Sequence, residues 1–202
     1  MANHLFIGLG GTGGKVLREL RKRVFEEFNS NDPEHGIFLE YIYLDSSDED
    51  LNDRTGWKVM GNSVHLGEAQ KVSIHGISTD MFNSIKHYPG LQSFLKPQDI
   101  QLIKEKRGPL VSAGIGGQRR RLGRILMANN LADKSNSRNF ETVFSGAIYR
   151  LQKKSGINAV TFHICAGLAG GTGSGSIIDV IAQIRKRYSY DQDTHSFKMN
   201  LM

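Results

Sequence analysis

The sequence has a single cysteine, four prolines and no long hydrophobic run. One cysteine excludes a disulfide framework within the chain and is typical of a reducing compartment, so we expect a cytoplasmic protein. No stretch approaches the roughly 20 apolar residues that a membrane helix needs, and the first residues lack the basic and apolar regions of a signal peptide. A disulfide-stapled scaffold is therefore excluded, and no membrane span is predicted.

Metal-ligand spacing is also missing, because the seven histidines do not recur at intervals typical of a zinc site. The formal net charge of +6 permits contact with nucleic acid or an acidic partner. The basic segment from Arg119 to Arg124 contains no interleaved aromatic residues of the kind that stack on bases. We therefore expect neither a protein-built zinc site nor a nucleic-acid groove.

Glycine, in contrast, is abundant and concentrated in short segments. One segment, Gly8 to Gly14, follows the apolar run Leu5 to Ile7, and a second, Ala169 to Ser176, follows the strand-like run Ala159 to Cys165. Each precedes a helical pattern, which begins at Lys15 and at Ile177. A strand, a glycine-rich turn and a helix together make an anion site, because a helix N-terminus has free N–H groups and partial positive charge. Two such units predict a polyphosphate held between two helix N-termini.

The rest of the chain alternates between strand-like and helical patterns. We expect further strands at Ile37 to Leu44 and Phe197 to Met202, short strands at 57–60 and 64–66, and helices at 79–87, 97–106, Gln118 to Leu131 and Phe140 to Lys154. Strands that alternate with helices predict an α/β fold, namely a Rossmann-like three-layer α/β/α sandwich with a mainly parallel sheet. We expect one nucleotide-binding domain over residues 1–202.

An NAD- or FAD-binding Rossmann domain is one alternative, because Gly8 to Gly13 satisfies the GxGxxG pattern. In such folds an acidic residue about 20 positions further on binds the ribose. Here the candidate, Asp45, follows Gly13 by more than 30 residues, and a dinucleotide fold gives no reason for the second glycine segment. The GxxxxGK[ST] pattern of P-loop enzymes is absent.

The second glycine segment, Gly170-Gly171-Thr172-Gly173-Ser174-Gly175, resembles the phosphate-binding loop of the tubulin and FtsZ superfamily. The opening segment resembles the first loop of FtsZ, and Tyr41 to Ser46 resembles the second strand and its turn. Gly114 to Arg124 is similar to the third loop, which lies near the γ-phosphate in that family. The nearest type looks like the divergent bacterial tubulin-like proteins.

The resemblance implies GTP or GDP with Mg²⁺ as the ligands. The residues that it places at the nucleotide are Gly10, Gly11, Thr12, Gly13, Lys15, Asp45, Ser46, Gly114, Gly116, Gly117, Gly170, Gly171, Thr172, Gly173, Ser174 and Gly175. Backbone N–H groups would cradle the phosphates with help from the Thr172 and Ser174 hydroxyls, and Asp45 would orient a Mg²⁺-bound water. Lys15 stands where FtsZ has an asparagine near the base and ribose.

The resemblance covers only the N-terminal part of the family fold, so we expect the family's central helix and C-terminal domain to be missing from residues 1–202. It implies a GTP-binding protein that forms filaments or nucleotide-dependent assemblies with itself or a protein partner. GTPase activity would then need the missing part or a neighbouring subunit, and no catalytic residue is assigned. The alternatives are a non-hydrolysing, nucleotide-gated interaction module in a bacterial defence or signalling assembly and, third, the NAD- or FAD-binding domain.

Overall fold

A computed structural model describes residues 2–33, 36–74, 95, 97, 120–188 and, by backbone alone, 197–201. The strands are β1 (Ala2–Leu9), β2 (Ile37–Asp45), β3 (Lys58–Val59), β4 (Asn62–Ser63), β5 (Lys71–Ser73), β6 (Val160–Ala166) and β7 (Phe197–Leu201). The helices are α1 (Gly10–Phe28), α2 (Asp48–Asn52), α7 (Arg120–Ala132), α8 (Phe140–Ser155), α9 (Gly171–Arg187) and the 3₁₀ turn η1 (Glu68–Gln70).

The main sheet has five strands in the order β5-β2-β1-β6-β7, and every neighbouring pair is parallel. The central strand β1 places Leu5 opposite Glu40 of β2 and Phe162 of β6. Because all these strands run the same way, their carboxyl ends meet at one edge of the sheet. Parallel sheets are normally covered on both faces, and this one is.

Side chains of β1 alternate between two apolar layers. Leu5, Ile7 and Leu9 pack into the larger cluster, to which α7, α8 and α9 contribute. Phe6 lies on the opposite face, against the cluster formed by α1, Tyr41, Trp57 and neighbouring residues. The predicted three-layer α/β/α architecture with a parallel sheet is therefore confirmed.

Helix α8 shows why local sequence predicts these elements well. Asn139 caps its first turn by accepting from the Thr142 N–H, and Gly156 ends it at a φ of 72°. Between these signals, Phe140, Phe144, Ala147 and other apolar residues face the sheet. The predicted range, Phe140 to Lys154, is confirmed to within one residue.

Other boundaries differ from the prediction. α1 and α9 begin at Gly10 and Gly171, so most of each glycine segment is the first turn of a helix and not a loop before it. The strand expected at 64–66 does not form: the Val64 N–H donates to the Trp57 carbonyl at 2.9 Å, but no strand follows, and Val64 and Leu66 pack in the same apolar cluster as Leu17 of α1. The expected helix at 79–87 lies outside the described residues, as does the one at 97–106 apart from Pro97.

Within the described segments, no helix combines the length and the hydrophobicity needed to cross a bilayer.

Candidate nucleotide site

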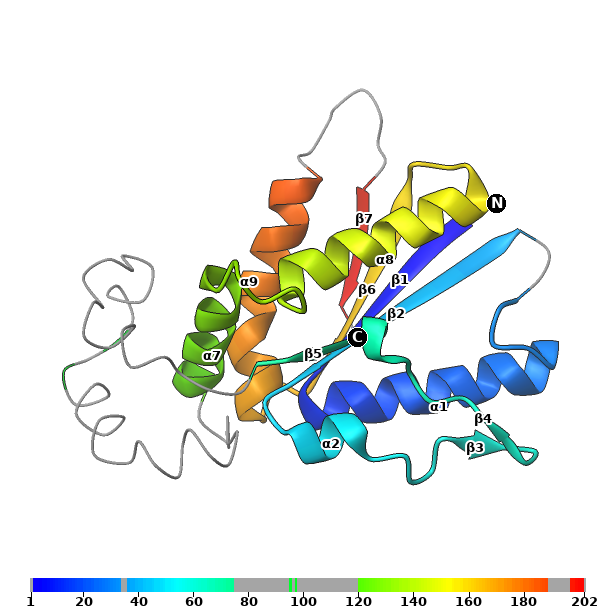
Figure 1. Ribbon diagram of the computed structural model, residues 1–202, viewed down its shortest axis with the longest axis horizontal. Helices are drawn as coiled ribbons and strands as arrows, with labels where there is room; N and C mark the ends of the chain where they lie inside the picture. Colours follow the sequence, from blue (N-terminus) through cyan, green and yellow to red (C-terminus); the bar gives the residue numbers. More distant parts are fainter. Residues whose placement is uncertain are drawn as a thin grey trace.

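The N-termini of α1 and α9 meet at the edge of the sheet where β1 and β6 end (Figure 1). Gly10 and Gly173 are in direct backbone proximity: a Cβ placed on Gly10 would lie 3.0 Å from the Gly173 nitrogen. Gly10 also has a φ of 69°, which favours glycine. Two helix starts therefore converge on one place, each with the partial positive charge of a helix N-terminus.

Both helix starts lack the side-chain caps that α2 and α8 carry. No side chain caps α1 or α9, and neither has an acidic residue in its first turn. In contrast, Ser47 caps α2 and Asn139 caps α8, and both of those helices have acidic residues in the first turn. Since the first N–H groups of a helix need acceptors, the starts of α1 and α9 are suited to an external anion.

Three of the glycines that were predicted to contact phosphate instead lie tightly against neighbouring backbone. A Cβ on Gly13 would lie 2.5 Å from the Cys165 carbonyl oxygen, and one on Gly173 would lie 2.7 Å from the Leu9 carbonyl oxygen. A Cβ on Gly175 would lie 2.4 Å from the Arg120 carbonyl oxygen. These glycines let α1, α7 and α9 approach their neighbours, so substitutions there disturb the fold itself.

Two other glycines are open toward solvent. A Cβ on Gly11 would meet only Asp50 Oδ2, at 3.9 Å, and one on Gly170 only the Gly167 carbonyl oxygen, at 3.7 Å. Both residues are exposed, as are Thr12 and Lys15, whereas Gly10, Gly13, Gly171, Thr172, Gly173 and Gly175 are buried. The accessible part of the site is therefore the outer side of the two first turns.

The predicted hydroxyl and carboxylate groups are already hydrogen-bonded within the chain. The Ser46 and Thr172 hydroxyl oxygens lie 2.7 Å apart, which joins the turn after β2 to the first turn of α9. Ser174 donates to the Gly170 carbonyl. Asp45 accepts from the Tyr43 hydroxyl at 2.9 Å and from the backbone N–H groups of the next two residues. Burial raises the pKa of Asp45, and these hydrogen bonds oppose the rise.

Residues 114–119 of the predicted third loop lie outside the described residues, including Gly114, Gly116 and Gly117, whereas residues 120–124 form the start of α7. This helix packs against the start of α9. Arg120 donates to the Leu168 carbonyl at 2.9 Å, and a Cβ on Gly123 would lie 2.2 Å from the Gly171 carbonyl oxygen. Further along, Arg124 pairs with Asp179 of α9 at 3.4 Å.

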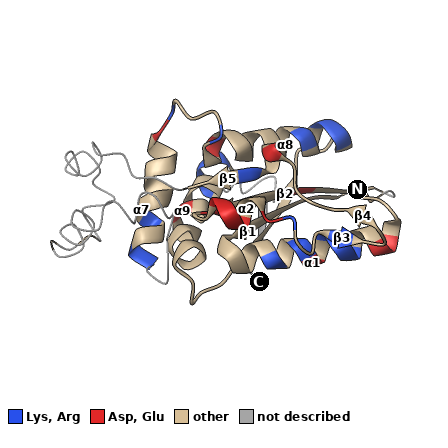
Figure 2. Cartoon of the chain, turned by 60° about the horizontal axis from the view of Figure 1, so that its bottom comes forward, with Lys and Arg blue, Asp and Glu red and all other residues tan. Residues whose placement is uncertain are grey.

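Sequence analysis missed the acidic helix α2, which lies beside α1 (Figure 2). Asp50 and Asp53 line a small cavity of about 70 Å³ together with Gly11, Gly14, Lys15, Arg18, Tyr43 and Trp57. Trp57 is buried there. The sequence contained a signal for this position, because α2 directly follows β2. Loops at the carboxyl ends of parallel strands lie at the same edge of the sheet, so the acidic residues of α2 could be expected near the two glycine segments.

Comparison with known proteins gives the family. The tubulin-like family model matches residues 5–202. A search of the curated proteins found no match. Two solved structures are similar: CetZ1 from Haloferax volcanii, a GDP-bound monomer, at 20% identity and a TM-score of 0.47, and CetZ from Methanosaeta thermophila strain DSM 6194, at 15% identity and a TM-score of 0.36. The matches cover 92% and 100% of this chain but only 38% and 46% of theirs. Because the family model matches nearly the whole sequence, the chain belongs to the tubulin-like family.

Proposed function

We propose that residues 1–202 form a nucleotide-binding domain that takes GTP or GDP, with the phosphates between the N-termini of α1 and α9. The observation that carries this proposal is the pair of adjacent, uncapped helix starts whose outer residues, Gly11 and Gly170, are open. Phosphate oxygens would accept from the N–H groups of the two first turns and interact favourably with both helix dipoles. The choice of guanine rests on membership of the tubulin-like family.

The residues around this site also fit a Mg²⁺ ion that keeps its waters. Asp50 is exposed, and its Oδ2 lies near Gly11. Asp45 is buried and already accepts from three donors. We therefore assign contact with a Mg²⁺-bound water to Asp50, while Asp45 fixes the turn that carries Ser46. The ion would neutralise phosphate charge that would otherwise face the carboxylates of α2.

Self-assembly into filaments remains the functional proposal that follows from the family, and we assign no catalytic residue. Among the described carboxylates at this edge, Asp45 is engaged by three donors, Asp179 pairs with Arg124, and Asp50 is assigned to the Mg²⁺-bound water. With these three in other roles, we expect hydrolysis to depend on an acidic group from outside the described residues. The alternative of a nucleotide-gated module without polymerisation predicts binding without assembly. Light scattering with GTP distinguishes the two, because only filaments raise it.

Isothermal titration calorimetry with GTP, GDP, ATP and NAD tests the binding proposal. We expect the two guanine nucleotides to bind most tightly and Mg²⁺ to strengthen GTP binding. Tighter binding of NAD would contradict the proposal and favour a dinucleotide fold. Tighter binding of ATP would retain the phosphate site but contradict guanine specificity, for which Lys15 would then be the first residue to examine.

A further inference from the structure

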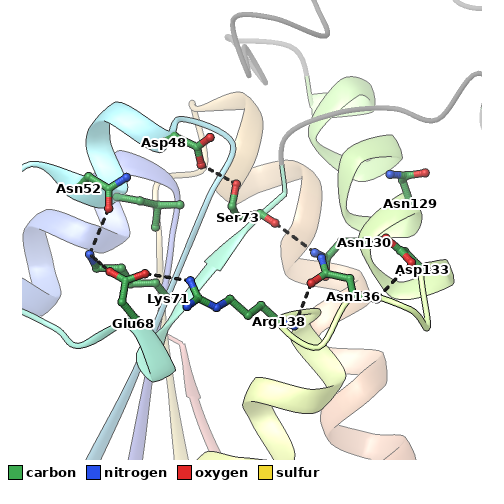
Figure 3. Close-up of a pocket in the computed structure, with 11 residues that line it drawn as sticks. Asp48, Asn52, Glu68, Lys71, Ser73, Asn129, Asn130, Asp133, Asn136 and Arg138 are labelled. Atoms are coloured by element: carbon green, nitrogen blue, oxygen red, sulfur yellow. Dashed lines mark hydrogen bonds and ion pairs between the residues drawn. The ribbon is translucent and has the colours of Figure 1, made fainter.

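A second, larger cavity of about 490 Å³ lies beyond the carboxyl end of β5 (Figure 3). Its described walls come from α2, from η1 and β5, and from the C-terminal end of α7 with the segment that joins it to α8. Among the described residues that line it, Leu51 is the one apolar side chain and none is aromatic. The volume suits a small molecule or a short peptide end, and the polar walls exclude an apolar ligand.

Hydrogen bonds between neighbouring elements hold the walls in place. Asn130 donates to the Ser73 carbonyl at 3.1 Å and accepts from the Phe140 N–H at 2.8 Å. This one amide therefore ties the end of β5 to α7 and to the start of α8. On the opposite wall, Asp48 accepts from the Ser73 hydroxyl at 2.7 Å. The cavity is thus preformed among the described residues.

Two cations in this cavity share a single carboxylate. The Lys71 side chain is only 7% exposed, and its ammonium lies 3.0 Å from Glu68 Oε1 and 3.3 Å from Asn52 Oδ1. The other oxygen of Glu68 lies 3.0 Å from Arg138 Nη1. Figure 3 shows the three charged side chains in a row along one wall. Glu68 itself is 58% exposed and belongs to a short 3₁₀ turn.

This arrangement makes Glu68 an exchangeable partner. A buried ammonium requires an anion, because leaving it unpaired is costly. The Glu68 side chain that supplies the anion is 58% exposed, so it can leave for solvent, where water solvates its charge. A ligand carboxylate can therefore take its position between Lys71 and Arg138 at small cost, while Glu68 rotates into solvent. Lys71 also has a third N–H beyond the two that bind Glu68 and Asn52.

The other charged residues that line the cavity indicate which groups the ligand carries beside its carboxylate. With Glu68 displaced, the cavity retains two carboxylates, Asp48 and Asp133, opposite the two cations. Asp133 forms hydrogen bonds with Ser135 and Asn136 but no ion pair within the described residues. Carboxylates at this end favour N–H or ammonium donors and disfavour a second anionic group.

We propose that this cavity binds a ligand with a terminal carboxylate and neighbouring N–H groups, namely a free amino acid or the C-terminus of a peptide. Its carboxylate replaces Glu68 between Lys71 and Arg138, and its N–H groups face Asp48 and Asp133. Glu68 is then a built-in competitor. The site is separate from the proposed nucleotide site and does not depend on it.

Calorimetry on the 202-residue chain tests this proposal, with tetraglycine as the probe and its C-terminal amide as the matched control. We expect the amide to bind at least about tenfold more weakly, because it loses a charge-assisted interaction. Glu68→Gln should tighten tetraglycine binding several-fold, and Lys71→Met should abolish it. Arg138→Gln, at an exposed position, should weaken it without the risk of disturbing the fold.

Equal binding of the peptide and its amide, or no tightening in Glu68→Gln, would overturn the proposal. Glycine as a third probe separates the two sources of the ligand. Binding as tight as that of tetraglycine supports a free amino acid, whereas weaker binding supports a peptide end. Each titration is repeated with saturating GDP. Unchanged results support a separate site, and loss of tetraglycine binding would show that the probe occupies the nucleotide site instead.

Discussion

Replacing Gly170 with aspartate should raise stability and lower nucleotide affinity at the same time. Gly170 is the N-cap of α9, with an extended backbone (φ −75°, ψ 160°) that any residue can adopt, and a Cβ there meets only the Gly167 carbonyl oxygen at 3.7 Å. An aspartate would cap the free N–H groups of the first turn. It would also place a negative charge where the proposed phosphates lie.

The two effects can be estimated. A charged cap in place of glycine stabilises a helix by about 0.5–1 kcal/mol, which corresponds to an increase of roughly 1–4 °C in the melting temperature of a domain of this size. Two unit charges about 5 Å apart repel by about 3 kcal/mol at an effective dielectric constant near 20. Even after screening by salt, GDP affinity should fall at least about tenfold.

The assay pairs thermal melts without nucleotide with calorimetry using GDP. Gly170→Asn is the matched control, because it caps the helix without the charge and should weaken binding less. Asn139→Ala removes the native cap of α8 and should cost about 1 kcal/mol of stability while leaving affinity unchanged. A Gly170→Asp variant that is more stable and binds GDP as tightly as the original chain would refute the proposed phosphate position.

Gly173→Val should lower the melting temperature by itself, because the Cβ would lie 2.7 Å from the Leu9 carbonyl oxygen, so a normal melt of this variant would contradict the packing described here. Asp50→Asn should reduce the dependence of GTP affinity on Mg²⁺ more than Asp53→Asn does, and calorimetry with and without Mg²⁺ would show an equal effect if Asp50 has no special role. Burial lowers the pKa of His4, whose Nδ1 lies 3.0 Å from Nε2 of His163, so the unfolded chain binds the proton more readily. The free energy of unfolding, measured with urea, should therefore be full above the ordinary pKa of 6.5 and fall as the pH drops below it. If His4→Gln shows the same dependence of that free energy on pH as the original chain, the loss belongs to other groups. The chain alone should release negligible phosphate from GTP, and turnover that rises with protein concentration would show instead that neighbouring copies complete a catalytic site.

Much of the fold could be predicted because local signals agree with it. The helix at Phe140 to Lys154 has a cap at each end and one apolar face, and the strand at Ile37 to Leu44 is a nearly continuous apolar run. The starts of α1 and α9 could not be placed, because glycine is a poor helix former and reads as a loop. Tertiary contact decides those positions: Gly13 and Gly173 permit close backbone approach that no periodicity reveals.

The site was predicted at the level of segments and less well at the level of residues. Two strand–glycine–helix units are enough to predict that both helix starts meet at one edge of a parallel sheet. Which glycines face solvent depends on packing between segments far apart in sequence, as for Gly175 against Arg120. The contact between Ser46 and Thr172 joins residues 126 positions apart and leaves no local pattern. The acids of α2, in contrast, directly follow β2 and could have been placed at this edge of the sheet.

The central claim is that phosphates bind between the first turns of α1 and α9. Amide chemical shifts of a ¹⁵N-labelled chain, recorded during titration with GDP, test it directly. The account predicts that the largest shifts fall on the first-turn amides of both helices, with Gly11 and Gly170 among them, and that Gly170→Asp removes them. Saturable shifts confined to other residues, or to only one of the two helices, would contradict it.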